Sequence, residues 1–486
     1  MRNSIKKIKK TALLSLILIA YIITACLVLD YPISGDSAIY AELTKSLYDN
    51  RNYMAGGVVH DVYPPLFPLL TIPFYAITQN PPLSVKLSSI LFACIAVAMI
   101  FLLCLELRIT AGYSAMIASL VALNPFFIYF TALIPYSEGL AIGLFYAGIW
   151  MWLRARGNTA YAISGLLFGL SLVTRMAFLA LVAPVFIHDA YNAWKSAKKE
   201  GILWSRHLIR ACTIAFPFAL WLLRNYLVLG TPEPTGYTRF TIHFFKSFFL
   251  NLGTYSLVTI PIALLALSPI IYWALATGRV KKTKLKEAGP ILFFSFALYL
   301  ILICLASNDF WHFKIIKDGV FQPHTFITTA FALTRYVLPF LPMAAIISFF
   351  IIGKRWKPVF FATALGISAI AMLLFNIGPL QMALDSAVGT PSTHTYRSYL
   401  RAEGIAWINH NAPPNSRVLV LFEDPGDNKM VQVNTYISHY FRKDLIVATE
   451  GQAHDFDFTI SDVKTVKGIE MFSKGSSSRI TVYAVS

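Results

Sequence analysis

Long stretches without charged side chains are the feature that most limits how this sequence can fold. A helix that crosses a bilayer needs about 20 largely apolar residues, and about eleven segments of the 486-residue chain approach that length. They lie near residues 11–29, 84–105, 112–133, 137–153, 159–174, 176–188, 208–229, 254–277, 288–306, 328–352 and 357–378. Only 13% of the residues are charged, against about 25% in a soluble domain. The sequence therefore predicts a mainly α protein, a polytopic transmembrane helical bundle of about 11 spans in the cell membrane.

Most Lys and Arg residues fall on one side when the N-terminus is placed in the cytoplasm. The N-terminal arm, the 189–210 loop and the 278–287 loop hold five basic residues each, and cytoplasmic loops are enriched in such residues. This distribution predicts a cytoplasmic N-terminus. It also accounts for much of the net charge of +17 without nucleic acid as a partner.

The loops on the opposite, extracytoplasmic side are longer. Residues 31–83 form the first of them, and residues 230–253 and 307–327 form two more. Because binding and catalytic residues concentrate in loops, the function is expected on this face.

The composition changes after Leu380, so that residues 1–380 form a transmembrane domain and residues 381–486 a polar one. The polar part has strand-like runs at 417–422 and 445–448, a segment that fits a helix at 429–441 and a final strand within 475–485. These features predict a small extracytoplasmic α/β domain, which we assign to acceptor recognition or to packing.

Asp36 stands at the beginning of the first long loop. Residues 37–48 place Ile39, Leu43 and Leu47 at helical spacing, which predicts a helix lying at the membrane interface. Asp36 is then either a cap of that helix or a catalytic carboxylate, and one residue can serve as both.

A proline-rich segment follows, from Tyr63 to Leu70, in which Pro64 and Pro65 suit the beginning of a helix. His60 and Asp61 come just before it. These two side chains can join Asp36 around a divalent cation or a sugar. The alternative is an exposed polar loop.

Glu138 lies at the mouth of the fourth predicted span, after a break or kink expected at Asn124-Pro125. It is the only acidic residue between Arg108 and Asp189. An ionisable residue in such a place is a functional candidate, and the alternative is an interfacial carboxylate that caps the span.

Three arginines lie at extracytoplasmic span ends, namely Arg175, Arg224 and Arg335. A guanidinium binds phosphate through two parallel hydrogen bonds and stays charged at any relevant pH. They are therefore candidates for holding the phosphate of a lipid-linked donor. The alternative is that they reach to lipid headgroups.

Taken in order, these segments resemble the GT-C superfamily of glycosyltransferases. They comprise a first outer loop that begins with an acid, Pro64-Pro65-Leu66, Ser137-Glu138, the run Trp221–Tyr226 and the run Arg335–Pro342. The greatest similarity is to the group of protein O-mannosyltransferases and aminoarabinose transferases. The likeness extends from Asp36 to about Pro342, and residues 381–486 add little to it.

The resemblance implies that residues 1–380 are a catalytic domain with an extracytoplasmic active site. The donor would be a polyprenyl-phosphate sugar, the acceptor a lipid, glycan or protein, and the transfer inverting. Asp36 matches the first-loop acid and would be the catalytic base, with Glu138 at the second acid position. His60, Asp61 and Tyr63 would then contact the acceptor or the sugar.

The sequence also departs from the pattern of this group. Asp36 is followed by Ser37, where the group often has a second acid. Some members bind a divalent metal cation through a loop Glu and a later His, but no Glu stands beside Pro64, which leaves a metal site at His243 without its partner. The signature Trp-Trp-Asp-x-Gly of oligosaccharyltransferases is absent.

Two other classes of function remain open. A carrier that flips a lipid-linked sugar would place charged residues at mid-bilayer and show internal repeats, and neither is evident in the sequence. A non-catalytic assembly subunit would keep the fold without the chemistry, and the presence of both Asp36 and Glu138 argues against it.

Overall fold

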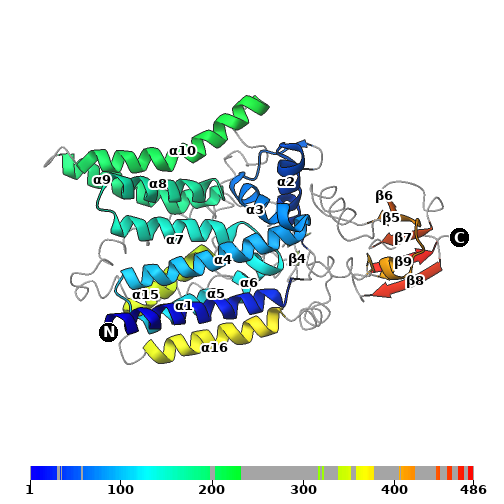
Figure 1. Ribbon diagram of the computed structural model, residues 1–486, viewed down its shortest axis with the longest axis horizontal. Helices are drawn as coiled ribbons and strands as arrows, with labels where there is room; N and C mark the ends of the chain where they lie inside the picture. The colour runs from blue at the N-terminus through cyan, green and yellow to red at the C-terminus, as the bar shows by residue number, and fades with distance from the viewer. Residues whose placement is uncertain are drawn as a thin grey trace.

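The computed structural model shows a bundle of long helices and a separate small β-sheet (Figure 1). The residues that it describes are 2–29, 33, 36–55, 58–197, 203–230, 316–317, 320–321, 338–351, 357–376, 404–405, 407–421, 445–448, 457–461, 469–474 and 480–484. The predicted spans at 254–277 and 288–306, together with Arg335 and His243, lie outside these residues.

Most of the described chain is helical. The helices are α1 (Arg2–Cys26), α2 (Asp36–Asn50), α3 (Leu66–Thr78), α4 (Pro81–Glu106), α5 (Ala111–Ala122), α6 (Pro125–Ile128), α7 (Glu138–Arg154), α8 (Asn158–Leu172), α9 (Leu179–Ala197), α10 (Leu203–Leu229), α15 (Leu341–Ile351) and α16 (Lys357–Asn376). Three short helical turns join them, the π-helix η1 (Tyr129–Leu133) and the 3₁₀ turns η2 (Met176–Phe178) and η3 (Leu338–Phe340).

The bundle has the length and composition of a multi-pass membrane protein. Within the described residues, three helices are long and apolar enough to cross a membrane, over Ile8–Cys26, Pro81–Glu106 and Ser205–Leu229. A fourth crossing is added if α5 and the helix after it are counted as one bent span. The predicted total of about 11 spans stays a prediction.

The break predicted at Asn124-Pro125 is confirmed. The Asn124 side-chain oxygen accepts hydrogen bonds from the backbone N–H groups of Phe126 and Phe127, as a helix-capping residue does. The chain turns by 59° between α5 and the following helix. Pro125 cannot supply the N–H that would continue α5.

Helices α8 and α10 pack closely because two glycines of α8 face α10. A Cβ atom added to Gly165 would lie 2.5 Å from the carbonyl oxygen of Arg210, and one added to Gly169 would lie 2.5 Å from that of Ile214. Both distances are too short for a side chain, so only glycine permits this approach of the two helix backbones.

A buried ion pair joins α9 to α10 beside this contact. Arg210 is fully buried, and its Nη1 donates to both carboxylate oxygens of Asp189 at 2.9 and 2.6 Å. The His207 ring lies 3.0 Å from Asp189, and the Arg210 guanidinium lies over the Tyr161 ring at 4.2 Å. Asp189 is thus buried within α9, which continues to Ala197, beyond the end of the apolar run predicted at 188.

The first loop is a folded unit at one end of the bundle. It contains α2, a hairpin of the two-residue strands β1 (Met54–Ala55) and β2 (Val58–Val59), and α3. The helix predicted over residues 37–48 is confirmed as α2, and its Ile39 and Leu43 are buried against Tyr53 and Trp221. Pro65 is the residue that precedes α3, as expected from the two prolines.

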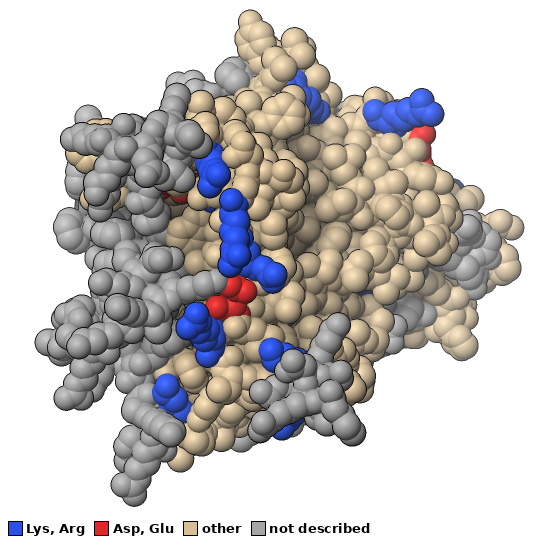
Figure 2. Space-filling model, turned by 60° about the vertical axis from the view of Figure 1, so that its left-hand side comes forward, with Lys and Arg blue, Asp and Glu red and all other residues tan. Residues whose placement is uncertain are grey.

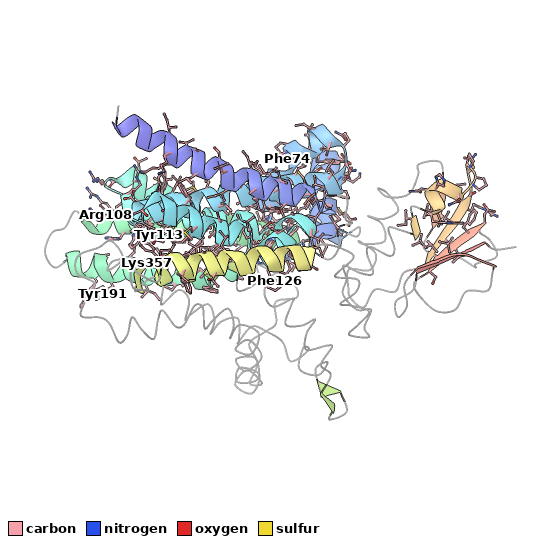
Figure 3. The ribbon with its side chains drawn as sticks, turned by 90° about the horizontal axis from the view of Figure 1, so that it is seen from below. Phe74, Arg108, Tyr113, Phe126, Tyr191 and Lys357 are labelled. Atoms are coloured by element: carbon pink, nitrogen blue, oxygen red, sulfur yellow. The ribbon has the colours of Figure 1, made fainter. Side chains whose placement is uncertain are left out.

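Basic side chains mark the opposite end of the bundle. Lys9, Lys10, Arg108, Arg154 and Arg156 are exposed there, and Figure 2 shows Lys and Arg gathered on the face of that end. Figure 3 places Arg108 and Lys357 at this end and Phe74, on α3, toward the other.

The C-terminal part forms a five-stranded mixed sheet in the order β6-β5-β7-β9-β8. Its strands are β5 (Arg417–Leu421), β6 (Ile446–Ala448), β7 (Phe458–Ser461), β8 (Ile469–Lys474) and β9 (Ile480–Ala484). Strands β5, β6 and β9 occupy the runs that the sequence indicates, whereas β7 and β8 were not predicted. A further two-residue hairpin pairs β3 (Ile316–Lys317) with β4 (Val320–Phe321).

Candidate active site

Asp36, the acid of the first loop, is hydrogen-bonded to the side chain of Tyr63, 27 residues later. Asp36 is the first residue of α2, and its Oδ1 accepts a hydrogen bond of 2.8 Å from the Tyr63 hydroxyl. Asp36 is partly exposed. A carboxylate that is oriented by a hydrogen bond and still partly open to solvent can take a proton from a bound substrate.

His60 fixes the position of Tyr63. The two rings are stacked, with centroids 5.1 Å apart and an interplanar angle of 12°, and the backbone N–H of Tyr63 donates to His60 Nε2 at 3.1 Å. His60 Nε2 must be unprotonated to accept this bond. Burial lowers the pKa of His60 to about 4. The charge of Arg224 also lowers this pKa, whereas the charges of Asp61 and Asp36 raise it. His60 is therefore neutral at physiological pH.

Arg224 reaches the same loop from α10. Its Nη1 donates to the His60 carbonyl oxygen and to Asn225 Oδ1, both at 2.9 Å. The guanidinium lies 5.3 Å from the Tyr53 ring centroid and 5.1 Å from that of Trp221. The aromatic faces stabilise the cation where it enters the loop.

Glu138 and Arg175 form a second charged pair in this part of the molecule. Arg175 Nη1 lies 2.9 Å from Glu138 Oε1, and the side chains are 13% and 1% exposed. Glu138 is the first residue of α7, and Arg175 lies in the turn after α8, between the predicted spans 159–174 and 176–188. Glu138 thus stands at a helix start, as the alternative has it, and is also buried against a guanidinium partner.

Two side chains to which the sequence assigns no role of their own connect these pairs. The hydroxyls of Tyr40 and Ser137 share a hydrogen bond of 3.0 Å, and the Tyr40 ring lies 5.3 Å from the Tyr63 ring. Their sequence signals are modest: Tyr40 follows Asp36 by one helical turn, and Ser137 directly precedes Glu138.

The other predicted residues fall into two groups. Asp61 is buried. Its negative charge interacts electrostatically with both His60 and Arg224. Arg335 and His243 lie outside the described residues. Among the described residues, no group of three His, Cys, Asp or Glu side chains could hold a metal ion.

Comparison with solved structures identifies the fold. The chain matches "ArnT from Cupriavidus metallidurans bound to Undecaprenyl phosphate" over 98% of both chains, with a TM-score of 0.50 and 13% identity. It matches the apo state of the same protein over 98% of both chains, with a TM-score of 0.51 and 13% identity. The Archaeoglobus fulgidus oligosaccharyltransferase aligns over 90% of this chain and 64% of its own, with a TM-score of 0.40 and 12% identity.

No protein-family model and no curated protein sequence matches the chain. The likeness to ArnT covers nearly the whole of both chains, and it agrees with the order of motifs from Asp36 to Pro342. The chain has the fold of the GT-C glycosyltransferases.

Proposed function

We propose that this protein is a membrane glycosyltransferase that moves a sugar from a polyprenyl-phosphate donor to an extracytoplasmic acceptor. The observation that carries the proposal is the convergence of Asp36, Tyr63, His60 and Arg224 from α2, the first loop and α10. A base and a fixed cation are the two groups that this transfer requires. ArnT, whose fold the chain shares, has been seen with bound undecaprenyl phosphate, which supports a donor of that class here.

The proposed step is a displacement at the anomeric carbon. The acceptor oxygen or nitrogen forms the new bond to that carbon while its proton moves to Asp36. The bond between the carbon and the phosphate oxygen breaks, and its electron pair leaves with the polyprenyl phosphate. A phosphate monoester has a second pKa near 6, so it can leave without a proton from a general acid. Attack opposite the leaving group inverts the anomeric centre.

The arginines divide between two roles in this proposal. Arg224 is partly exposed and keeps further N–H groups for a donor phosphate. Arg175 already balances Glu138, so its contact with the phosphate would have to compete with that carboxylate. Glu138 would orient the acceptor or the base. Arg335 remains a candidate phosphate ligand on its sequence position alone.

Reconstitution in liposomes distinguishes a glycosyltransferase from a carrier of sugar-lipids. The purified protein is placed in liposomes with the polyprenyl-phosphate-sugar fraction extracted from the source organism and with cell-envelope material as acceptor. We expect free polyprenyl phosphate to be released and the acceptor to gain the mass of the sugar. Sugar-lipids that change leaflet intact would instead establish a carrier, and unchanged sugar-lipids in their original leaflet would favour a non-catalytic subunit.

A further inference from the structure

A buried tyrosine connects α2, which carries Asp36, to the residue that precedes Glu138. Tyr40 lies on α2 four residues after Asp36, and residues at this spacing share one face of a helix. Its side chain is 1% exposed. The hydroxyl bonds to Ser137 at 3.0 Å, and Ser137 precedes Glu138 at the beginning of α7.

The Tyr40 ring also supports the group that orients Asp36. Its centroid lies 5.3 Å from that of Tyr63, and Tyr63 donates the hydrogen bond to Asp36 Oδ1. The Tyr40 ring also packs edge-on with the ring of Phe67 of α3, with centroids 4.9 Å apart. The ring thus packs against two aromatic neighbours, and the bond to Ser137 directs its hydroxyl.

The charges around Tyr40 come from both parts of the site. Burial raises the pKa of the Tyr40 phenol. The charge of Arg175 lowers this pKa, whereas the charges of Asp36 and Glu138 raise it. The phenol is therefore uncharged and lies within electrostatic reach of both carboxylates. A neutral hydroxyl at this place can fix a distance between two acids without adding a third charge.

We propose that Tyr40 is a positioning residue that sets the Asp36–Tyr63 pair at a fixed place relative to Glu138 through its hydrogen bond to Ser137. This inference rests on the proposed function and names a residue that the transfer requires in addition to the acids. A base must be held close to its productive geometry, because small displacements from that geometry reduce rates severely. The contact with Ser137 ties α2, which carries the base, to α7, which carries the second acid.

The chain offers a matched control for the loss of a buried tyrosine hydroxyl. Tyr21 of α1 is also fully buried, and its hydroxyl bonds to Thr131 at 2.7 Å. Tyr21→Phe therefore removes the same kind of hydrogen bond without touching the site. Any loss that comes only from weaker packing or a missing buried bond should be seen in both variants.

The test measures polyprenyl phosphate release by wild type, Tyr40→Phe, Ser137→Ala, the double variant and Tyr21→Phe. Losing one neutral hydrogen bond should lower kcat about five- to ten-fold in each site variant, with an unchanged KM for the extracted sugar-lipid. The double variant should lose no more than the worse single variant, since the two changes remove one shared bond. Tyr21→Phe should keep kcat within about two-fold of wild type, because Tyr21 shares no partner with the site residues.

Binding of undecaprenyl phosphate, measured on the same purified variants, should not change. Normal kcat in Tyr40→Phe and Ser137→Ala, beside an inactive Asp36→Asn, would overturn the positioning role and leave the proposed function standing. Multiplied losses in the double variant would also overturn it. Full activity of Asp36→Asn would reject the base itself, and the positioning role with it.

Discussion

At the residue scale, the neutral state of His60 has a consequence for stability. Burial lowers the pKa of His60 to about 4 in the folded protein, against the ordinary value of 6.5. Between these values the unfolded chain binds more protons than the folded one, so stability rises with pH and is lost as pH falls from about 6.5 toward 4. Protonation would also break the bond from the Tyr63 N–H to Nε2.

We therefore expect the wild type to lose thermal stability across this window more steeply than His60→Phe. Phenylalanine keeps the stacking on Tyr63 and does not titrate. The melting temperature in detergent, followed from pH 7 to pH 4, is the measurement. His410→Phe, which replaces an exposed histidine of the C-terminal part, is the control. Parallel curves for wild type and His60→Phe would contradict the buried neutral histidine.

Individual site residues were predictable from the sequence, but their contacts were not. Asp36 and Glu138 stand out as acids beside long apolar runs, and His60, Asp61 and Tyr63 as polar residues before two prolines. The hydrogen bond from Tyr63 to Asp36 depends on how the β1–β2 hairpin folds the loop back. Two-residue strands leave no periodic pattern, so nothing in the sequence indicated that contact.

At the element scale, α8 and α10 set where two arginines enter the site. Arg175 follows α8 and Arg224 lies near the end of α10, and Gly165 and Gly169 hold the two helices in close contact. The ion pair between Arg210 and Asp189 joins the N-terminal part of α10 to α9. The separation of α8 from α10 therefore fixes the placement of the cations on which the proposed donor site depends.

Gly165→Ala should push α10 away from α8. The added methyl group meets the Arg210 carbonyl oxygen at 2.5 Å, and overpacking of this kind costs about 1–3 kcal/mol of stability. We expect a lower melting temperature and weaker binding of undecaprenyl phosphate. Gly157→Ala is the matched control, since the same methyl group at the residue before α8 meets no atom within 4 Å. Equal behaviour of the two variants would disprove the close contact.

Elements with a strong periodic or punctuating signal were predictable. The bend at Asn124-Pro125 and the helix α2 are examples, because a proline and a repeated apolar face act locally. Strands β7 and β8 were missed, since each is short and gains its stability from pairing with β9 across the sheet. The last turns of α9 were missed because an apolar run ends where polar residues begin, whereas the helix continues through Asp189, which pairs with Arg210 of another helix.

At the scale of the whole molecule, the two ends of the bundle differ in character. The end with α2 and α3 carries the candidate site, whereas Lys9, Lys10, Arg108, Arg154 and Arg156 are exposed at the other end; Figure 3 labels Arg108 there. Cytoplasmic faces of membrane proteins are rich in Lys and Arg. This arrangement supports the proposal that the site faces the extracytoplasmic side.

Cysteine labelling in intact cells or spheroplasts tests that orientation. The native cysteines are first replaced, and single cysteines are then placed at two exposed positions, Asn50 at the end of α2 and Thr159 at the start of α8. We expect an impermeant thiol reagent to label position 50 only. Permeabilised cells should give labelling at both positions. Labelling of position 159 alone in intact cells would invert the topology and move the site to the cytoplasm.

The most direct test of the proposed transfer is the turnover of purified Asp36→Asn at saturating donor and acceptor. Asparagine keeps an oxygen that can accept the Tyr63 hydrogen bond, but it cannot take a proton. We expect release of polyprenyl phosphate to fall by about 10²-fold or more, with undecaprenyl phosphate binding retained. Asp49→Asn, which removes a surface carboxylate of the same helix paired with Lys45, should stay near wild type. Near-normal turnover of Asp36→Asn would show that Asp36 is not the base.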